Sequence, residues 1–553
     1  MTGTGSAPAA GTGAAQGTVR RLIVYTILFA LVTIAAIGVR GLLERLLDPG
    51  APSAIGGTTG VALSLAFALI GGPLAAVLWW LVWRRLATAS ERSSLAWGLY
   101  VTAVSALSLI VATSSLLVTA TALVAGRWLP GDFATGVVWA LVWVWHRWMW
   151  RHPLRHPIRL QTVPAVVGSV YGLVIGVGGA VTGLGALVDS ALRVTSEQAI
   201  AGSPWWHTAL DGLLWALAGG LIWWWHWYHD GARRLTTGLA GVALVVVGVM
   251  GAGILMLGGL ATVLYVALRL ALDSSDPAPE ILQPLGTAVA AASVGALVWH
   301  VHRRIAVERS DGTRRASTLV MSAVGLAAAA SGIGVVLNAT LAAFTGPLAG
   351  DTRSLLLGGI SALVVGGPTW WLSWRPTRPV EPAEVADTGR RVYLIAVFGV
   401  SAVVALIALL VVGFRVFEFG LDAATGASLV ERVRAPLGLL VATLLVFGYH
   451  FAVWRRDRAV IAAGGLVSER RIGRVILIAP GDAASLAPIE RAVREATRAS
   501  VTVWRRAVDE PAIAPDAAPD AAAVVAALEG VAGKRVLVVA GPDARVEVVP
   551  LAD

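Results

Sequence analysis

The chain has no cysteine, and Lys534 is its only lysine. The lack of cysteine excludes disulfide bonds, thiolate nucleophiles and cysteine-ligated zinc or iron–sulfur centres. Charged residues are also scarce, at 14% of 553 residues, whereas a soluble globular protein has about a quarter. Hydrophobic residues make up 57%, and apolar stretches long enough to cross a bilayer recur along most of the chain. The sequence therefore predicts an all-α polytopic membrane protein.

Apolar segments alternate with short connections, and twelve of them are long enough to be spans. Helices are the form expected for such segments, because backbone groups in lipid must be hydrogen-bonded within the segment. We therefore expect six tandem transmembrane helical hairpins. The twelve segments are 21–43, 59–83, 95–125, 133–149, 163–188, 208–228, 236–270, 285–301, 316–344, 354–374, 391–418 and 434–454.

Composition divides the chain into three parts. Residues 1–19 lack a basic n-region and a cleavage site, so they are predicted to be a disordered cytosolic tail rather than a signal peptide. Residues 20–458 form the membrane domain, and residues 459–553 form a small α/β cytosolic domain. The hairpins are predicted at about 20–90, 91–155, 156–230, 231–310, 311–385 and 386–458.

The arginines are distributed unevenly between the two ends of the segments. Loops after even-numbered segments carry most of them, whereas the acidic residues Asp48, Asp132, Asp189, Asp273 and Asp351 gather at the opposite ends. The chain is predicted to be a multi-pass protein of the plasma membrane. The positive-inside rule then places both of its termini in the cytoplasm. The net charge of +10 indicates contact with anionic lipid rather than with nucleic acid.

The even-numbered segments end in a shared motif, seen most clearly in GGPTWWLSWR at 366–375. A small residue is followed by aromatic residues or histidine at +3, +4 and +7 and by arginine at +8. The odd-numbered segments begin 67 to 81 residues apart, so the motif marks an internal repeat. The residues that carry it are Trp79, Trp80, Trp83 and Arg84; Trp143, His146 and Arg147; Trp223, Trp224 and Trp227; Trp299, His302 and Arg303; Trp370, Trp371, Trp374 and Arg375; and His450, Trp454 and Arg455.

Offsets +4, +7 and +8 are predicted to share one helical face. Tryptophan favours the boundary between water and lipid, and arginine one step further faces the phosphates. The motif is therefore interpreted as a cytoplasmic interfacial anchor built six times. One alternative is an aromatic and basic surface that binds lipid headgroups or a partner. Another is a motif that binds a cofactor.

This pattern resembles the bacterial membrane family catalogued as domain of unknown function 5671. The resemblance rests on Arg21 with Tyr25, on Arg391 with Tyr393, and on the six end motifs, and it would cover residues 20–458 as tandem copies. The second and sixth hairpins depart from the pattern at Val142 and His450, where tryptophan is usual. The resemblance implies an architecture of repeated two-helix units and no particular activity.

Ionisable residues that could couple transport to a proton are missing from the middle of the segments. Asp189, Asp211 and Glu418 all lie near segment ends, and Asn338 is the most polar deep side chain, expected to join helices. This pattern argues against a charge-coupled carrier. It leaves a passive pore or a lipid-handling protein open.

Two further patterns in the sequence are candidates for a binding site. His226 and His229 are three apart and could share a face toward a metal or haem, although histidine at an Arg-rich boundary is more often an ordinary polar residue. The stretches 71–73 and 366–368, each Gly-Gly-Pro, could break a helix into an ion site, but a local kink is the preferred interpretation. We expect no metal, no cofactor and no catalytic residues.

The C-terminal region differs in kind from the rest. Strands are predicted at 474–479, 501–506, 535–540 and 544–550, and helices at 485–500 and 521–531, with a linker at 511–520. Residues 540–545 are expected to form a hairpin turn, and 479–485 a plain strand-to-helix turn rather than an anion site.

These observations favour a non-enzymatic membrane scaffold or binding protein. Its cytoplasmic Trp/Arg rim would contact anionic membrane lipids, and residues 459–553 would contact a cytosolic protein. A passive transporter or channel for a small solute is the alternative, and a membrane redox protein that uses the interfacial histidines is a weaker one. The oligomeric state is left open.

Overall fold

The computed structural model describes residues 10–48, 57–194, 204–273, 276–344, 350–377, 385, 387–421, 428–463, 472–479, 483–497, 499–505, 520–531, 533–540 and 546–551. The chain divides into two compact units. One consists of Met1–Arg378 and Val392–Phe451, and the other of Pro379–Arg391 and Ala452–Asp553. The first unit is helical, and the second holds a four-stranded sheet.

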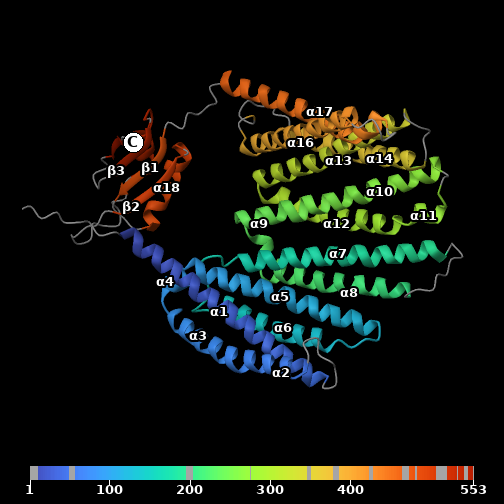
Figure 1. The fold of residues 1–553 in the computed structure, drawn as a ribbon. Coiled ribbons are helices and arrows are strands. Elements are labelled where there is room, and N and C mark those ends of the chain that lie inside the picture. Colours follow the sequence, from blue (N-terminus) through green and yellow to red (C-terminus); the bar gives the residue numbers. More distant parts are fainter. Residues whose placement is uncertain are drawn as a thin grey trace, which may run out of the picture. The chain divides into compact units, whose positions relative to one another are not determined.

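Long helices that run side by side form the helical unit (Figure 1). The first, α1, begins at Ala10, within the stretch that the sequence assigns to a tail. Consecutive helices contact each other along their lengths, as with α5 and α6, α7 and α8, α10 and α12, and α13 and α14. The long helices, together with the short segments that continue directly into them, are α1 (Ala10–Leu47), α2 (Gly57–Ala66), η1 (Phe67–Gly71), α3 (Gly72–Arg85), α5 (Leu95–Val124), α6 (Pro130–Trp150), α7 (Val163–Val194), α8 (Trp205–Trp224), η2 (Trp225–His229), α9 (Gly238–Ala243), η4 (Leu244–Gly251), α10 (Ala252–Leu272), α12 (Leu285–Arg309), α13 (Asp311–Ala343), α14 (Gly350–Trp374), α16 (Thr388–Leu421) and α17 (Leu429–Ala463). The short ones are α4 (Ala89–Arg92), η3 (Ala232–Arg234), α11 (Ala278–Leu282) and η5 (Arg375–Thr377).

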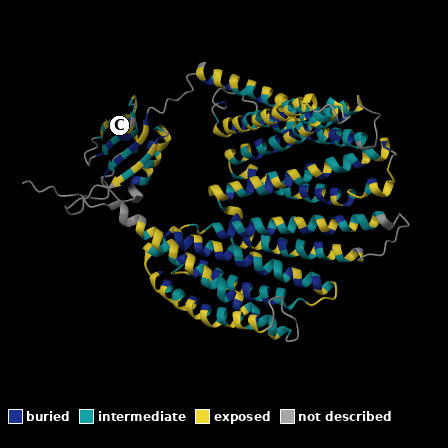
Figure 2. Ribbon diagram, viewed as in Figure 1, coloured by how far each residue is buried: buried dark blue, intermediate teal, exposed yellow. Residues whose placement is uncertain are grey.

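Ten helices in the described part of the chain are long and apolar enough to cross a membrane. Two of the segments predicted as spans, which fold as α6 and α8, are not among them. Helix α6 carries Asp132, His146 and Arg147 together with five tryptophans, and these side chains lower its mean hydropathy. Apolar side chains are exposed along the outer faces of the helices, as expected where lipid is the solvent (Figure 2).

The two Gly-Gly-Pro stretches remain helical. Gly71 ends the π-helical turn η1, and α3 starts at Gly72 with Pro73 in its first turn. A π turn accommodates a proline because it rearranges the backbone hydrogen bonds that the missing N–H would break. Pro368 lies inside the unbroken helix α14.

Glycines let α7 and α8 approach until their backbones touch. A Cβ atom on Gly219 would lie 2.2 Å from the backbone nitrogen of Gly176, and one on Gly212 would lie 2.3 Å from that of Gly183. This is the small-residue packing that joins helices in lipid, where hydrophobic association contributes little. The largest cluster of buried side chains, in contrast, gathers around Trp97, Tyr100 and Met149 at the Arg-rich helix ends.

The second unit holds a mixed sheet in the order β2-β1-β3-β4. Strand β1 (Ile472–Ala479) pairs in parallel with β2 (Ser500–Arg505) and with β3 (Gly533–Ala540), and β4 (Val546–Leu551) runs antiparallel to β3. Helices α18 (Ala483–Thr497) and α19 (Ala521–Ala527) pack on one face of the sheet, over a core that is fully buried at Val475, Leu477 and Val536. The predicted strands and helices of this region are confirmed, whereas the linker at 511–520, except Asp520, and the middle of each predicted turn lie outside the described residues.

Candidate functional site at the Arg-rich helix ends

The structure divides the repeated end motif between two faces of each helix. At +7, Trp374 is 1% exposed and Trp227 is 7% exposed, whereas at +4, Trp80, Trp224 and Trp371 are 53%, 51% and 44% exposed. The predicted common face for +4, +7 and +8 is therefore wrong. Offsets +3 and +7 are one turn apart and point inward, and offsets +4 and +8 are one turn apart and point outward.

The outward half of the motif is a tryptophan with an arginine over its ring. The guanidinium carbon of Arg84 lies 4.5 Å from the ring centroid of Trp80, and that of Arg303 lies 5.0 Å from Trp299. Arg84, Arg303, Arg375 and Arg455 are all exposed. Trp80 is exposed like its arginine, whereas Trp299 is partly buried and packs against the core of buried side chains. The interfacial anchor stays a prediction, for which an indole beside a cation is suited.

Arg147 does not fit this outward arrangement. Its two terminal nitrogens donate to the carboxylate of Asp230 at 2.9 and 2.8 Å, and Arg151 donates to the same carboxylate. The Asp230 side chain is fully buried, so the pair joins the end of α6 to the turn after η2. Sequence reasoning missed Asp230, although an acidic residue next to an Arg-rich loop was a signal that could have drawn attention to it.

Four buried histidines share one hydrogen-bonding geometry at these ends. Each donates its Nδ1–H to the backbone carbonyl four residues earlier, with distances of 2.8 to 2.9 Å. Because a carbonyl can only accept, this bond assigns the hydrogen to Nδ1 and directs Nε2 away from its own helix. The four are His146 with Val142, His226 with Ile222, His302 with Val298, and His450 with Val446.

Three of these histidines lie between two aromatic rings in nearly the same way. His302 is 6.1 Å from Trp223 and 5.6 Å from Trp227, with ring planes at 55° and 52°. His450 is 6.4 Å from Trp370 and 5.6 Å from Trp374, with planes at 55° and 56°. The histidine of one hairpin thus docks on the inward +3 and +7 tryptophans of the preceding hairpin.

The third arrangement, around His146, uses a different second ring. Trp79 lies 6.5 Å away at 57°, and Tyr100 on α5 takes the place of a tryptophan at 5.6 Å and 56°. Trp83 turns away and stacks on Trp148 at 5.4 Å. We call the three arrangements the histidine clusters, and each joins two consecutive hairpins.

The histidine clusters correct the register of the sixth hairpin. The sequence placed His450 at +3, whereas its ring contacts and its bond to Val446 are those of His146 and His302 at +7. Shifting the motif by one turn aligns Val446 with Val142 and Val298. Trp454 then falls one turn beyond the cluster, in the second unit, where Arg458 lies 5.5 Å from its ring.

The Nε2 atoms of the three clusters have different environments. That of His146 lies 3.0 Å from the hydroxyl of Tyr100, which can donate to it. That of His450 is buried and has no hydrogen-bond partner among the described residues, and the same holds for the indole nitrogen of Trp370. Tyr393 on α16 packs against this histidine at 6.1 Å, and its hydroxyl lies 3.0 Å from that of Ser322.

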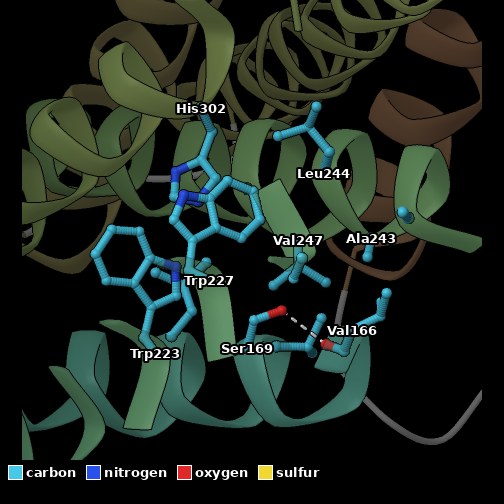
Figure 3. Close-up of a pocket in the computed structure, with 13 residues that line it drawn as sticks. Val166, Ser169, Trp223, Trp227, Ala243, Leu244, Val247 and His302 are labelled. Carbon is cyan, nitrogen blue, oxygen red and sulfur yellow. Dashed lines mark hydrogen bonds between the residues drawn. The ribbon is translucent and has the colours of Figure 1, made fainter. Parts of the chain in front are cut away.

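A small cavity lies beside the middle cluster (Figure 3). It measures about 20 Å³, room for one water-sized molecule. Its wall includes the indoles of Trp223 and Trp227, whose buried N–H groups find no partner in the part of the chain that the structure describes. In the other clusters a tyrosine of the preceding helix reaches the histidine. Here that helix supplies Leu244 and Gly248, and a Cβ on Gly248 would lie 2.5 Å from the His302 ring.

The pair His226 and His229 does not converge. His226 is buried against Gly168 of α7, with its Nε2 3.7 Å from Asp230. His229 is exposed, packs on Trp225 at 4.5 Å and has its Nε2 3.2 Å from Arg151. Within the described residues, no group of three or more His, Asp or Glu side chains is arranged around a common point that could hold a metal ion.

These features define a class: a multi-pass helical membrane protein with a small C-terminal sheet. Two regions of the chain, 21–129 and 315–445, match the family model described as domain of unknown function (DUF5671), so the resemblance found in the sequence is confirmed over those residues. Each region includes parts of two consecutive hairpins and two helices of one histidine cluster, although the histidines themselves, His146 and His450, follow the first and the second region. No curated protein and no solved structure matches the chain.

Proposed function

We propose that this protein is a non-enzymatic membrane scaffold that holds anionic lipid at a cytoplasmic Trp/Arg rim. In this proposal all twelve segments span the plasma membrane as six hairpins, and both termini lie in the cytoplasm. The asymmetry of arginine between the two ends of the helices supports the orientation. Helices α6 and α8 count as spans because each packs along a neighbour that is itself long and apolar enough to cross.

The observation that carries the proposal is the outward Trp/Arg pair. It recurs on α3 as Trp80 with Arg84 and on α12 as Trp299 with Arg303, with the cation over the ring in each. An exposed guanidinium near the membrane surface attracts anionic lipid by about 1 kcal/mol, and several at one level add together. The buried histidine clusters hold the helix ends together, so the exposed arginines Arg84 and Arg303 lie on a rigid frame.

Lipid retention tests the rim. Variants W80L/R84Q and W299L/R303Q, combined in the full chain, should retain fewer phosphatidylglycerol molecules after extraction than the parent, when native mass spectrometry counts them. R127Q, on an exposed arginine in an odd-numbered loop, is the control and should leave the count unchanged. An unchanged count in the combined rim variant would contradict the proposal.

The absence of cysteine makes the orientation simple to test. Single cysteines replace Ser90, in an Arg-rich loop, and Ala125, in an Arg-poor one, and both positions are exposed. A membrane-impermeant maleimide added to intact cells should label A125C and leave S90C unlabelled until the cells are opened. The opposite result would reverse the proposed topology.

For the C-terminal unit we propose a cytosolic protein as the partner. The sheet face opposite α18 and α19 carries Ile476, Ile478, Leu537 and Val539 in register, with Trp504 beside them at 55% exposure. An exposed tryptophan among apolar neighbours is typical of a protein-binding surface. W504E should abolish co-purification of a stoichiometric soluble protein, and co-purification that survives this change would exclude the sheet face.

A further inference from the structure

A cavity of about 680 Å³ lies between α13, α16 and α17 in the helical unit. Its walls are apolar and small, with Ala327, Ala330 and Gly334 on one face of α13. Val400 and Leu439 on its rim are 64% and 46% exposed, so the cavity opens toward the outside of the unit. Measured along α13 from Ala323 to Asn338 it extends about 22 Å, at about 1.5 Å per residue.

Contacts at both ends hold the three helices around this cavity. At one end, α13 and α17 touch, since a Cβ on Gly438 would lie 2.3 Å from the Gly334 carbonyl oxygen. At the other end, Tyr393 of α16 meets Ser322 of α13 and packs beside His450 of α17. Between these two contacts the small side chains do not reach across, and the groove remains.

The glycine end of the groove carries a positive charge. Arg434 donates to the side-chain oxygen of Asn338 at 3.1 Å, and Asn338 lines the cavity. Among the described residues no carboxylate lies within ion-pair distance of Arg434. The Asn338 amide nitrogen is left as a further donor, because its oxygen already accepts from the arginine.

The carboxylates near this helix end contact other groups. Glu418 is 2.8 Å from Arg415 and 3.7 Å from Arg432. Glu431 accepts from the Ser428 backbone N–H while its own N–H donates to the Ser428 hydroxyl, which is the capping box that starts α17. Within the described part of the chain, Arg434 thus contacts a neutral amide and forms no ion pair with a carboxylate.

We propose that this groove binds one anionic phospholipid, with its phosphate on Arg434 and Asn338 and an acyl chain along the small-residue wall. The apolar lining matches an acyl chain, and a guanidinium is suited to a phosphate. The site lies at the Arg-poor ends of the helices, away from the Trp/Arg rim. It does not depend on the proposed function of that rim.

Photo-crosslinking tests the site in the full chain reconstituted in nanodiscs. The probe is phosphatidylglycerol with a diazirine midway along one chain, and phosphatidylcholine with the same chain is its neutral counterpart. Peptide mapping should place the crosslink on α13 and α17 beside Ala330 and Thr443, with phosphatidylglycerol preferred. Equal labelling by the two lipids would contradict the proposal that Arg434 selects an anionic headgroup.

Two variants and two matched controls separate the headgroup from the chain. R434Q should lower the phosphatidylglycerol crosslink about tenfold, as expected for the loss of one charge-assisted contact, while R127Q leaves it unchanged. A330F should block the groove for both lipids, while L445F, at a residue 56% exposed on the outer face, should not. Undiminished crosslinking in R434Q and A330F would overturn the proposal, as would crosslinks that map outside the groove.

The controls also distinguish this site from the rim and from a solute pathway. A rim variant that loses retained lipid but keeps the groove crosslink contradicts neither proposal. Groove crosslinking that is abolished by a small water-soluble solute, together with flux of that solute into liposomes, would replace the lipid site with a passive transport route.

Discussion

Removing one tryptophan from the fifth hairpin should be far more damaging than removing its neighbour three residues away. Trp374 is 1% exposed, donates to the Tyr449 hydroxyl at 2.8 Å, stacks on Tyr393 at 5.3 Å and packs against His450. Truncating a buried tryptophan to alanine costs about 3–5 kcal/mol, because both the transfer energy and the cavity count. Trp371 is 44% exposed, and W371A should change stability by no more than about 0.5 kcal/mol.

The assay is the temperature at which the purified full chain, in one detergent, loses half of its monodisperse peak. W374A should fall well below the parent, whereas W371A should remain close to it. The same order is expected for W227A against W224A, since these residues are 7% and 51% exposed. Equal losses within each pair would refute the division of the motif into inward and outward faces, and a larger loss for the outward residues would reverse it.

Three further perturbations test contacts inside the helical unit or inside the sheet unit. D230N should destabilise the helical unit by about 3 kcal/mol, because it leaves the cation of Arg147 without its buried partner, and D230N/R147Q should recover part of that loss in the same heating assay. G248V should lower the same midpoint, because its side chain would overlap the His302 ring, and an unchanged midpoint would contradict the packing at that cluster. L477A, in the fully buried core of the sheet, should cost about 2–5 kcal/mol and speed hydrogen exchange in β1 and β3 while leaving hydrogen exchange in the helical unit unchanged.

The repeated end motif predicted some features of the structure correctly and others wrongly. The Trp/His/Arg motif predicted that the even helices end alike, and the shared Nδ1 bonds of His146 and His302 agree with that. Its register failed in the sixth hairpin, because the match relied on Trp454 and Arg455 rather than on the histidine. The inner partner of a residue is set by the neighbouring helix, and a single helix's sequence does not contain that information.

The same limit explains the residues that the sequence did not single out. Asp230 and Tyr100 are ordinary residues in a linear reading, and each gains its role from a side chain far away in the chain. The groove was equally hidden, since Ala327, Ala330 and Gly334 read as generic packing residues in a chain rich in alanine and glycine. The groove exists because contacts at both of its ends hold α13, α16 and α17 apart between them.

Local sequence determined which segments are apolar and helical, where the arginines gather, and where the strands and helices of the C-terminal region lie. These properties depend on neighbours within a few residues. Tertiary structure alone decided which motif residues face inward, that Arg147 pairs with Asp230, and that an open groove lies beside Asn338. These depend on how helices are placed against one another, and that placement follows from the summed packing of many small contacts that lie far apart in the chain.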